Sequence, residues 1–111
     1  MFNGFASGFT DEQLDNFIQD SERIMRRPAG LLLAQAGLDA STKTPFNLLD
    51  HACGTGPIAA HLYTTLDKQV LAQSKMLCAD VSENLVHALR KRAYKHGWPN
   101  IETAILDAQV R

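Results

Sequence analysis

Three short apolar segments, each ended by an aspartate, are the feature that most constrains the fold of this 111-residue chain. The segments are residues 46–50, 75–80 and 101–106, and the aspartates are Asp50, Asp80 and Asp107. Short apolar runs bounded by proline, glycine or turn residues are typical of strands buried in a parallel sheet. Helical segments separate them, so the sequence predicts an α/β fold with a parallel sheet.

Two helices are predicted before the first strand. Thr10 and Gln13 fit a capping box, and apolar residues recur at helical spacing after them, which predicts a helix over residues 11–27. Pro28 suits the first position of a helix, so we expect a second, shorter helix to begin there and to end at Gly37.

The remaining helices connect the strands. Pro57 is placed to begin one helix, and Ser82 can cap another, which Gly97 ends. The chain thus divides into an N-terminal helical segment, 1–37, and an α/β segment, 38–111. We expect the second segment to be a Rossmann-like parallel sheet with helices on both faces, of which only the first three strands are present.

The first strand is the difficult element of this topology. In a doubly wound sheet it lies at the centre, and later strands add on its other side. We expect no partner strand for it within residues 1–111. We therefore expect a truncated half-fold, incomplete at its C-terminus, in which the first strand has an open edge and a face without covering helices. Such an edge is a template for self-association.

Composition and charge exclude several classes of partner. The 11 Lys and Arg nearly balance the 12 Asp and Glu, so no charge excess attracts nucleic acid or an acidic membrane surface. No apolar run approaches the ~18 residues of a membrane span, and the N-terminus lacks the pattern of a signal peptide. The two cysteines are not spaced as in a zinc site or a disulfide scaffold. We expect a cytoplasmic protein with no metal site.

Each of the three aspartates stands at the carboxyl end of its predicted strand. In an open α/β sheet, ligands bind at the edge where the carboxyl ends of the strands meet. Between the first two, residues 52–56 contain two glycines, which let the backbone turn sharply close to a ligand. Asp80 follows Gly56 by 24 positions (80 − 56), near the ~20-residue spacing of an acidic residue that binds ribose hydroxyls. Asp107 can accept a hydrogen bond from an exocyclic amine. Adenosine with a small zwitterionic tail fits this pattern.

These segments resemble the motifs of class I S-adenosylmethionine (SAM)-dependent methyltransferases. Residues 48–56 are similar to the first motif, an acidic residue followed by GxGxG, and residues 77–82 and 105–109 resemble the second and third. The sequence is most similar to fungal methyltransferases related to the ubiquinone and menaquinone C-methyltransferases, some of which methylate thiols in secondary metabolism. The resemblance covers about residues 30–111.

The resemblance implies methyl transfer from SAM to a small-molecule acceptor, at an O, N, C or S atom that the sequence does not specify, with this chain alone inactive. It assigns the methionine portion of SAM to Asp50, Ala52, Cys53, Gly54, Thr55 and Gly56, the ribose to Asp80, one adenine face to Val81, and the adenine edge to Asp107 and Ala108. It also implies that the N-terminal helix can form part of a lid over the acceptor. A general base is optional in this chemistry, and no catalytic residue is predicted.

Several side chains in or near these motifs have structural interpretations. Ala52 stands where the family usually has its first glycine, and its methyl group is compatible with the loop only if φ is negative. Cys53 and Cys78 are interpreted as core residues, and His51 as a packed or solvated imidazole. The basic residues of the helix after Ser82 are predicted to form a solvated face; they are Arg90, Lys91, Arg92 and Lys95.

Two alternative functions are consistent with parts of the pattern. Residues 54–59 also read as G-x-G-x-x-A, the fingerprint of an NAD(P)-dependent oxidoreductase. The acidic Asp50, unfavourable near a pyrophosphate, and the third carboxylate, Asp107, argue against it. The other alternative is a non-catalytic partner that keeps the nucleoside site, or only its shape, and serves assembly.

Overall fold

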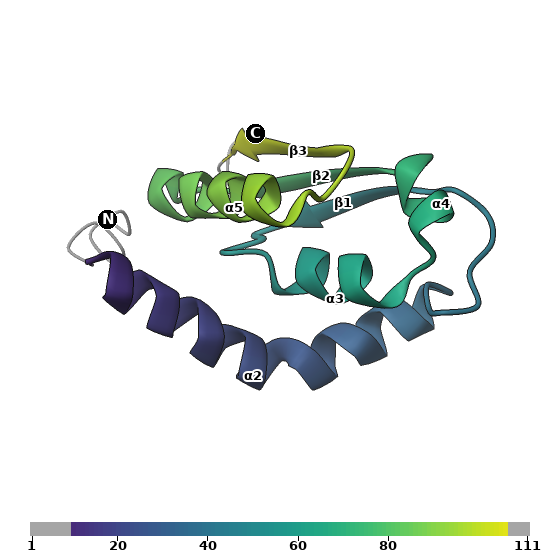
Figure 1. The fold of residues 1–111 in the computed structure, drawn as a ribbon, viewed down its shortest axis with the longest axis horizontal. Helices are drawn as coiled ribbons and strands as arrows, with labels where there is room; N and C mark the ends of the chain where they lie inside the picture. Colours follow the sequence, from purple (N-terminus) through teal and green to yellow (C-terminus); the bar gives the residue numbers. More distant parts are fainter. Residues whose placement is uncertain (1–9, 107–111) are drawn as a thin grey trace.

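The computed structural model describes residues 10–106, whose strands form one parallel sheet in the order β1-β2-β3 (Figure 1). The elements are α2 (Asp11–Gln35), β1 (Asn47–His51), α3 (Pro57–Thr65), α4 (Lys68–Ala72), β2 (Lys75–Asp80), α5 (Glu83–His96) and β3 (Ile101–Ile105). Three parallel strands separated by helices confirm the predicted α/β class. Each strand begins and ends within one residue of its predicted bounds.

The apolar core lies between one face of the sheet and the helices α3 and α5. The register pairs Leu48 with Met76 and Met76 with Ile101, so these side chains share that face. They pack with buried Leu62 from α3 and Leu89 from α5. Helix α2 packs on α3, on the side away from the strands (Figure 1).

The opposite face of the sheet is more open. Leu49 points to that face and is 60% exposed, and Leu77 beside it is half-buried. Within residues 10–106 the helices that pack on the sheet lie on one face, whereas helices were predicted on both. The reason is topological: right-handed crossovers that always step in the same direction leave their helices on the same face. Within these residues β1 is an edge strand; its Leu48 side packs on the core, and its Leu49 side is exposed.

Helix α2 is one continuous helix, and the prediction of two helices separated at Pro28 is wrong. A proline inside a helix removes one N–H donor and crowds the preceding turn, and α2 is visibly curved (Figure 1). Pro28 is exposed, whereas Ala29 and Leu33 are buried and hold the second half of the helix against the rest of the molecule. Neither α2 nor any other helix within residues 10–106 has both the length and the apolar content needed to cross a membrane.

The predicted helix caps are confirmed. Thr10 and Gln13 form the capping box of α2, with both reciprocal hydrogen bonds present. The Ser82 hydroxyl accepts a hydrogen bond from the Leu85 N–H at 3.3 Å, and Gly97 ends α5 with a left-handed φ of 67°. Helix α4 was not predicted, because five residues are too few to show a helical period.

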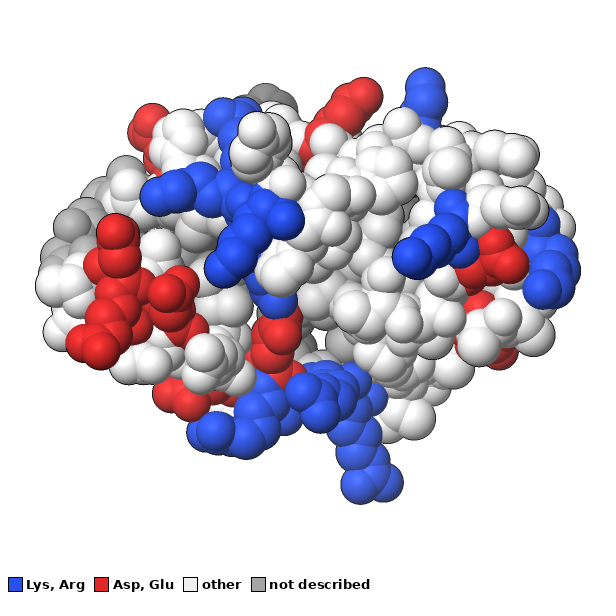
Figure 2. Space-filling model, in the orientation of Figure 1, with Lys and Arg blue, Asp and Glu red and all other residues white. Residues whose placement is uncertain are grey.

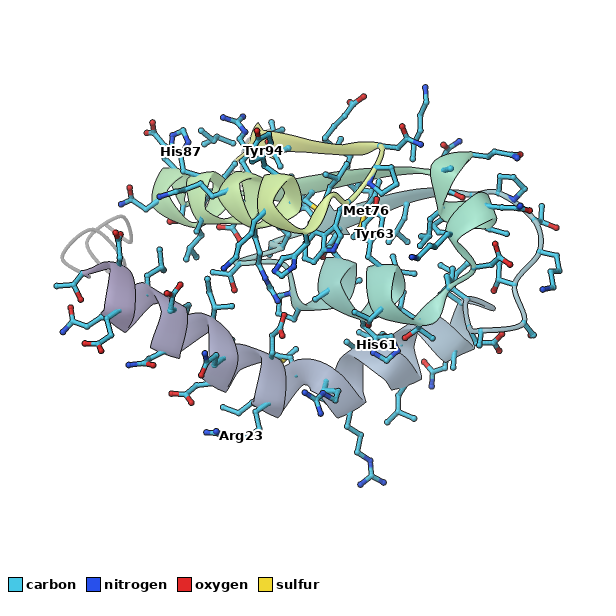
Figure 3. The ribbon with its side chains drawn as sticks, in the orientation of Figure 1. Arg23, His61, Tyr63, Met76, His87 and Tyr94 are labelled. Carbon is cyan, nitrogen blue, oxygen red and sulfur yellow. The ribbon has the colours of Figure 1, made fainter. Side chains whose placement is uncertain are left out.

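Gly30 allows α2 to approach α3 closely. A Cβ atom added at Gly30 would lie 3.1 Å from Cε1 of His61, whose ring lies between the two helices (Figure 3). Any larger residue at this position would need the imidazole to move. Contact between the N-terminal helix and the α/β segment therefore depends on a residue without a side chain.

Candidate functional site

The carboxyl ends of the strands and the loop between β1 and α3 meet at one end of the sheet (Figure 1). Asp50 belongs to β1, Asp80 ends β2, and residues 52–56 form the connection that we call the glycine loop. Together these residues make up the strand-end rim. Val81, another predicted cofactor residue, directly follows Asp80 and belongs to the rim as well. The remaining two, Asp107 and Ala108, lie outside the described residues, so their assignment stays a prediction.

Asp80 fastens the glycine loop to the end of β2. Its Oδ2 atom accepts a hydrogen bond from the Gly54 N–H at 2.8 Å, and its Oδ1 atom accepts one from the Ser82 N–H at 2.9 Å. The Cys53 N–H adds a bond to the carbonyl of Ala79 at 2.9 Å. Each carboxylate oxygen has two lone pairs, so Asp80 retains acceptor capacity for a ligand hydroxyl.

Asp50 is the electrostatically unfavourable member of the rim. It is only 9% exposed, and its Oδ2 atom is buried without a hydrogen-bond partner among the described residues. Burial raises the pKa of Asp50 to about 6, the negative charge of Asp80 adds to the rise, and His51 opposes it. A buried, unpaired carboxylate beside a second carboxylate favours the approach of a cationic group.

The glycine loop contains three residues in the left-handed region. Their φ angles are 66° at Ala52, 58° at Gly54 and 96° at Gly56. A negative φ was expected at Ala52, and the positive value shows that this expectation is wrong. The left-handed conformation costs a non-glycine residue roughly 1–2 kcal/mol. The loop therefore keeps the backbone shape of a glycine at this position while bearing a methyl group.

Gly56 is required by packing as well as by its conformation. A Cβ atom added there would lie 2.5 Å from Cδ1 of Leu89, a core residue of α5. No comparable contact exists at Gly54, where a Cβ atom would have no neighbour within 4 Å among the described residues. Gly56 thus lets α5 pack against the start of α3, whereas Gly54 serves the turn itself.

Side chains of the rim differ in what they can offer a ligand. Val81 is 51% exposed and presents an apolar surface directly after Asp80. Cys53 and Thr55 are buried, so they present little surface to a ligand, whereas Ala52 is exposed. Cys53 and Cys78 are both free thiols of the core, which confirms their interpretation. A hydrogen bond with Cys53, together with burial, raises the pKa of the Cys78 thiol.

Arg92 is a rim contact that the sequence analysis missed. The prediction of a solvated basic face on α5 is wrong for this residue, whose side chain is only 11% exposed. Its Nη1 group donates to the carbonyl of Thr55 at 3.1 Å, its Nη2 group pairs with Glu22 of α2, and its guanidinium lies 5.3 Å from the ring centre of Trp98. The sequence does contain one indication that Arg92 is buried. It follows the core residue Leu89 by three positions, so it lies beside the buried stripe of the helix.

Two hollows of the described part lie beside α2, away from Asp50 and Asp80. One of 480 Å³ lies between α2 and α5, and one of 440 Å³ lies between α2, α3 and Trp98; both are lined by Glu22 and Arg92. Acidic residues of α2, including Asp15, face basic residues of α5, including Lys91, across the first hollow. Figure 2 shows basic and acidic side chains gathered on neighbouring parts of one face of the molecule.

Comparison with known proteins identifies the family. The profile of the ubiE/COQ5 methyltransferase family matches residues 35–109, which include the whole strand-end rim. The chain belongs to this SAM-dependent methyltransferase family. The chain is also 38% identical over 81 residues to the acetylaranotin bis-thiomethyltransferase of Aspergillus terreus and to methyltransferase tpcH of Aspergillus fumigatus. Both alignments cover 73% of this chain, but only 30% and 29% of those methyltransferases, so the chain spans about a third of their length.

Solved structures share the fold, a methyltransferase among them. Coclaurine N-methyltransferase, bound to N-methylheliamine and S-adenosylhomocysteine (SAH), superposes with a TM-score of 0.59 at 15% identity, over 95% of this chain and 26% of that one. A structure described as conversion of a disulfide bond into a thioacetal group during echinomycin biosynthesis superposes with a TM-score of 0.51 at 27% identity, over 73% of this chain and 29% of that one. The three strands and their helices are therefore a fragment of the methyltransferase fold.

Proposed function

We propose that this chain forms the cofactor-binding part of a methyltransferase that transfers the methyl group of SAM to a small-molecule acceptor. The observation that carries the proposal is the rim itself. Asp50 offers a buried carboxylate oxygen without a partner among the described residues, Asp80 offers acceptors beside the glycine loop, and Val81 offers an apolar surface. These groups suit the ammonium, ribose and adenine of SAM in that order along the rim.

The residues have different tasks in this proposal. Asp50 and the glycine loop hold the methionine portion, Asp80 accepts from the ribose hydroxyls, and Val81 covers one adenine face, with Asp107 and Ala108 at the adenine edge. Bound SAM supplies a methyl group on an electrophilic sulfonium. The protein then has to align the cofactor and exclude water, and no general base is assigned.

The acceptor belongs to the class of small molecules of fungal secondary metabolism. The relatives named above support this, and the name bis-thiomethyltransferase makes a thiol the first acceptor to test. The edge of β1 that β2 leaves free stays the predicted place of self-association. An NAD(P)-binding role is less favourable, because an unpaired Asp50 carboxylate would repel a pyrophosphate.

Isothermal titration calorimetry of the whole 111-residue chain with SAH, SAM and NAD tests the proposal. We expect SAH and SAM to bind and NAD not to bind. Asp80→Asn keeps the shape of the side chain but loses its charge and one acceptor, so SAH affinity should fall about 10- to 100-fold, from a charged hydrogen bond of about 1.5–3 kcal/mol. Asp20→Asn, whose side chain is 60% exposed on α2, is the matched control and should leave binding unchanged. Binding of NAD without any response to SAH would overturn the assignment.

A further inference from the structure

Arg92 joins three parts of the molecule that are distant in sequence. It belongs to α5, its Nη1 group donates to the carbonyl of Thr55 in the glycine loop, and its Nη2 group pairs with Glu22 in α2. Trp98 lies against the guanidinium at 5.3 Å. Because a guanidinium is planar and its donors are fixed in one fork, a change at one partner alters the geometry at the other.

The contact with Thr55 matters because the glycine loop is held from two sides. The Gly54 N–H is bound by Asp80 on the β2 side, and the Thr55 carbonyl is bound by Arg92 on the α5 side. The peptide group after Thr55 enters Gly56, whose φ is 96°. The N–H of the same peptide group donates to the carbonyl of Cys53 at 3.0 Å, so rotation of this peptide would break that turn and change the shape of the glycine loop.

The contact with Glu22 connects this loop to the N-terminal helix. Helix α2 packs mainly on α3, and the Glu22–Arg92 ion pair adds a link to α5. The Glu22 side chain is 28% exposed, so solvent screens the pair only in part. We infer that Arg92 is a positioning residue that couples the docking of α2 to the shape of the glycine loop, and so to cofactor affinity. This inference rests on the proposed function.

Helix α2 provides its own matched control. Asp20 and Arg23 form a second carboxylate–guanidinium pair on the same helix, at 3.0 Å, with side chains 60% and 75% exposed. Arg23 points away from α3 and α5 in Figure 3. Glu22→Gln and Asp20→Asn each remove one carboxylate from one such pair, but only Glu22 is connected to the loop.

The experiment measures SAH affinity by calorimetry for the whole chain and these two variants, at a temperature where circular dichroism shows all of them folded. Glu22→Gln should weaken SAH binding about fivefold, the lower end of ordinary coupling between sites, and Asp20→Asn should not change it. Arg92→Lys should weaken binding at least as much, because one ammonium cannot reach both partners. The double variant Glu22→Gln/Arg92→Lys should then bind no worse than Arg92→Lys alone.

Amide hydrogen exchange gives a second measurement that does not need a ligand. The Gly54 N–H, protected by Asp80, should exchange faster in Glu22→Gln than in the wild type, and at the wild-type rate in Asp20→Asn. If the wild-type chain fails to bind SAH, the proposed function is refuted. The exchange rate of the Gly54 N–H would then still test whether Glu22 affects the glycine loop. Equal effects of Glu22→Gln and Asp20→Asn on Gly54 exchange would overturn the inference.

Discussion

Replacement of Asp50 by asparagine removes a charge that folding places in an unfavourable position. The carboxylate is 9% exposed, its Oδ2 atom has no described partner, and its pKa rises from 3.8 to about 6 because of burial and of the neighbouring Asp80. A shift of about two pKa units corresponds to roughly 3 kcal/mol of lost stability when the group is ionised. Residual solvent contact at the rim reduces this, so we expect Asp50→Asn to stabilise the chain by about 1–2 kcal/mol at pH 8.

The pH dependence of this effect has a definite sign. The folded pKa lies above the unfolded value, so the contribution of Asp50 to stability is complete below about pH 4 and is lost as the pH rises through 6. The free energy of unfolding, measured by urea denaturation, should therefore differ little between Asp50→Asn and the wild type at pH 4. The variant should become progressively more stable than the wild type between pH 4 and 7, and the difference should stay constant above that.

Asp39→Asn is a control with the opposite sign. Hydrogen bonds from Ser41 lower the pKa of this exposed carboxyl group, so its small contribution to stability is present at neutral pH and lost in acid. An Asp50→Asn variant that is less stable than the wild type at pH 8 would refute the reasoning, because Asp50 would then have a stabilising partner. The same substitution should weaken SAH binding, so that stability and affinity change in opposite directions.

The glycine loop gives two further predictions, both measured as changes in thermal unfolding. Ala52→Gly should stabilise the chain by about 1 kcal/mol, because it relieves the left-handed φ of 66°, whereas Ala34→Gly at an exposed position of α2 should cost about 1 kcal/mol. If Ala52→Gly and Ala34→Gly both destabilise the chain, the backbone at Ala52 is not strained. Gly56→Ala should cost more than about 2 kcal/mol through its contact with Leu89, and Gly54→Ala about 1 kcal/mol. Equal losses would mean that backbone conformation, and not packing, makes Gly56 necessary.

The strands and helix ends could be predicted because their signals are local. The run 75–80 matches β2 at both ends, since it is apolar and bounded by polar residues. Ser82 and Gly97 mark the ends of α5 through their own side chain and backbone preferences. The position of Asp80 at the end of its strand followed from the same run, and the structure brings it to the glycine loop as expected.

The features that were missed depend on contacts between distant segments. Pro28 has a strong local preference for a helix start, but burial of Leu33 on the following turn keeps α2 continuous. The left-handed φ of Ala52 is imposed by the turn and the bonds that fasten it, which no property of alanine indicates. Arginine is usually a surface residue. Arg92 is buried because Glu22 and Thr55 lie within reach of its guanidinium.

The charge arrangement of the strand-end rim argues for the kind of ligand that it receives. Two carboxylates lie at neighbouring strand ends, and backbone N–H groups satisfy Asp80 but not the Oδ2 atom of Asp50. A dinucleotide would bring a pyrophosphate to the helix start beside the unpaired charge and increase the repulsion that already raises the pKa of Asp50. A ligand with an ammonium group and a sulfonium would instead lower the free energy of both carboxylates. We therefore propose that the unfavourable charge of Asp50 in the free protein makes the rim selective for a cationic nucleoside over an anionic one.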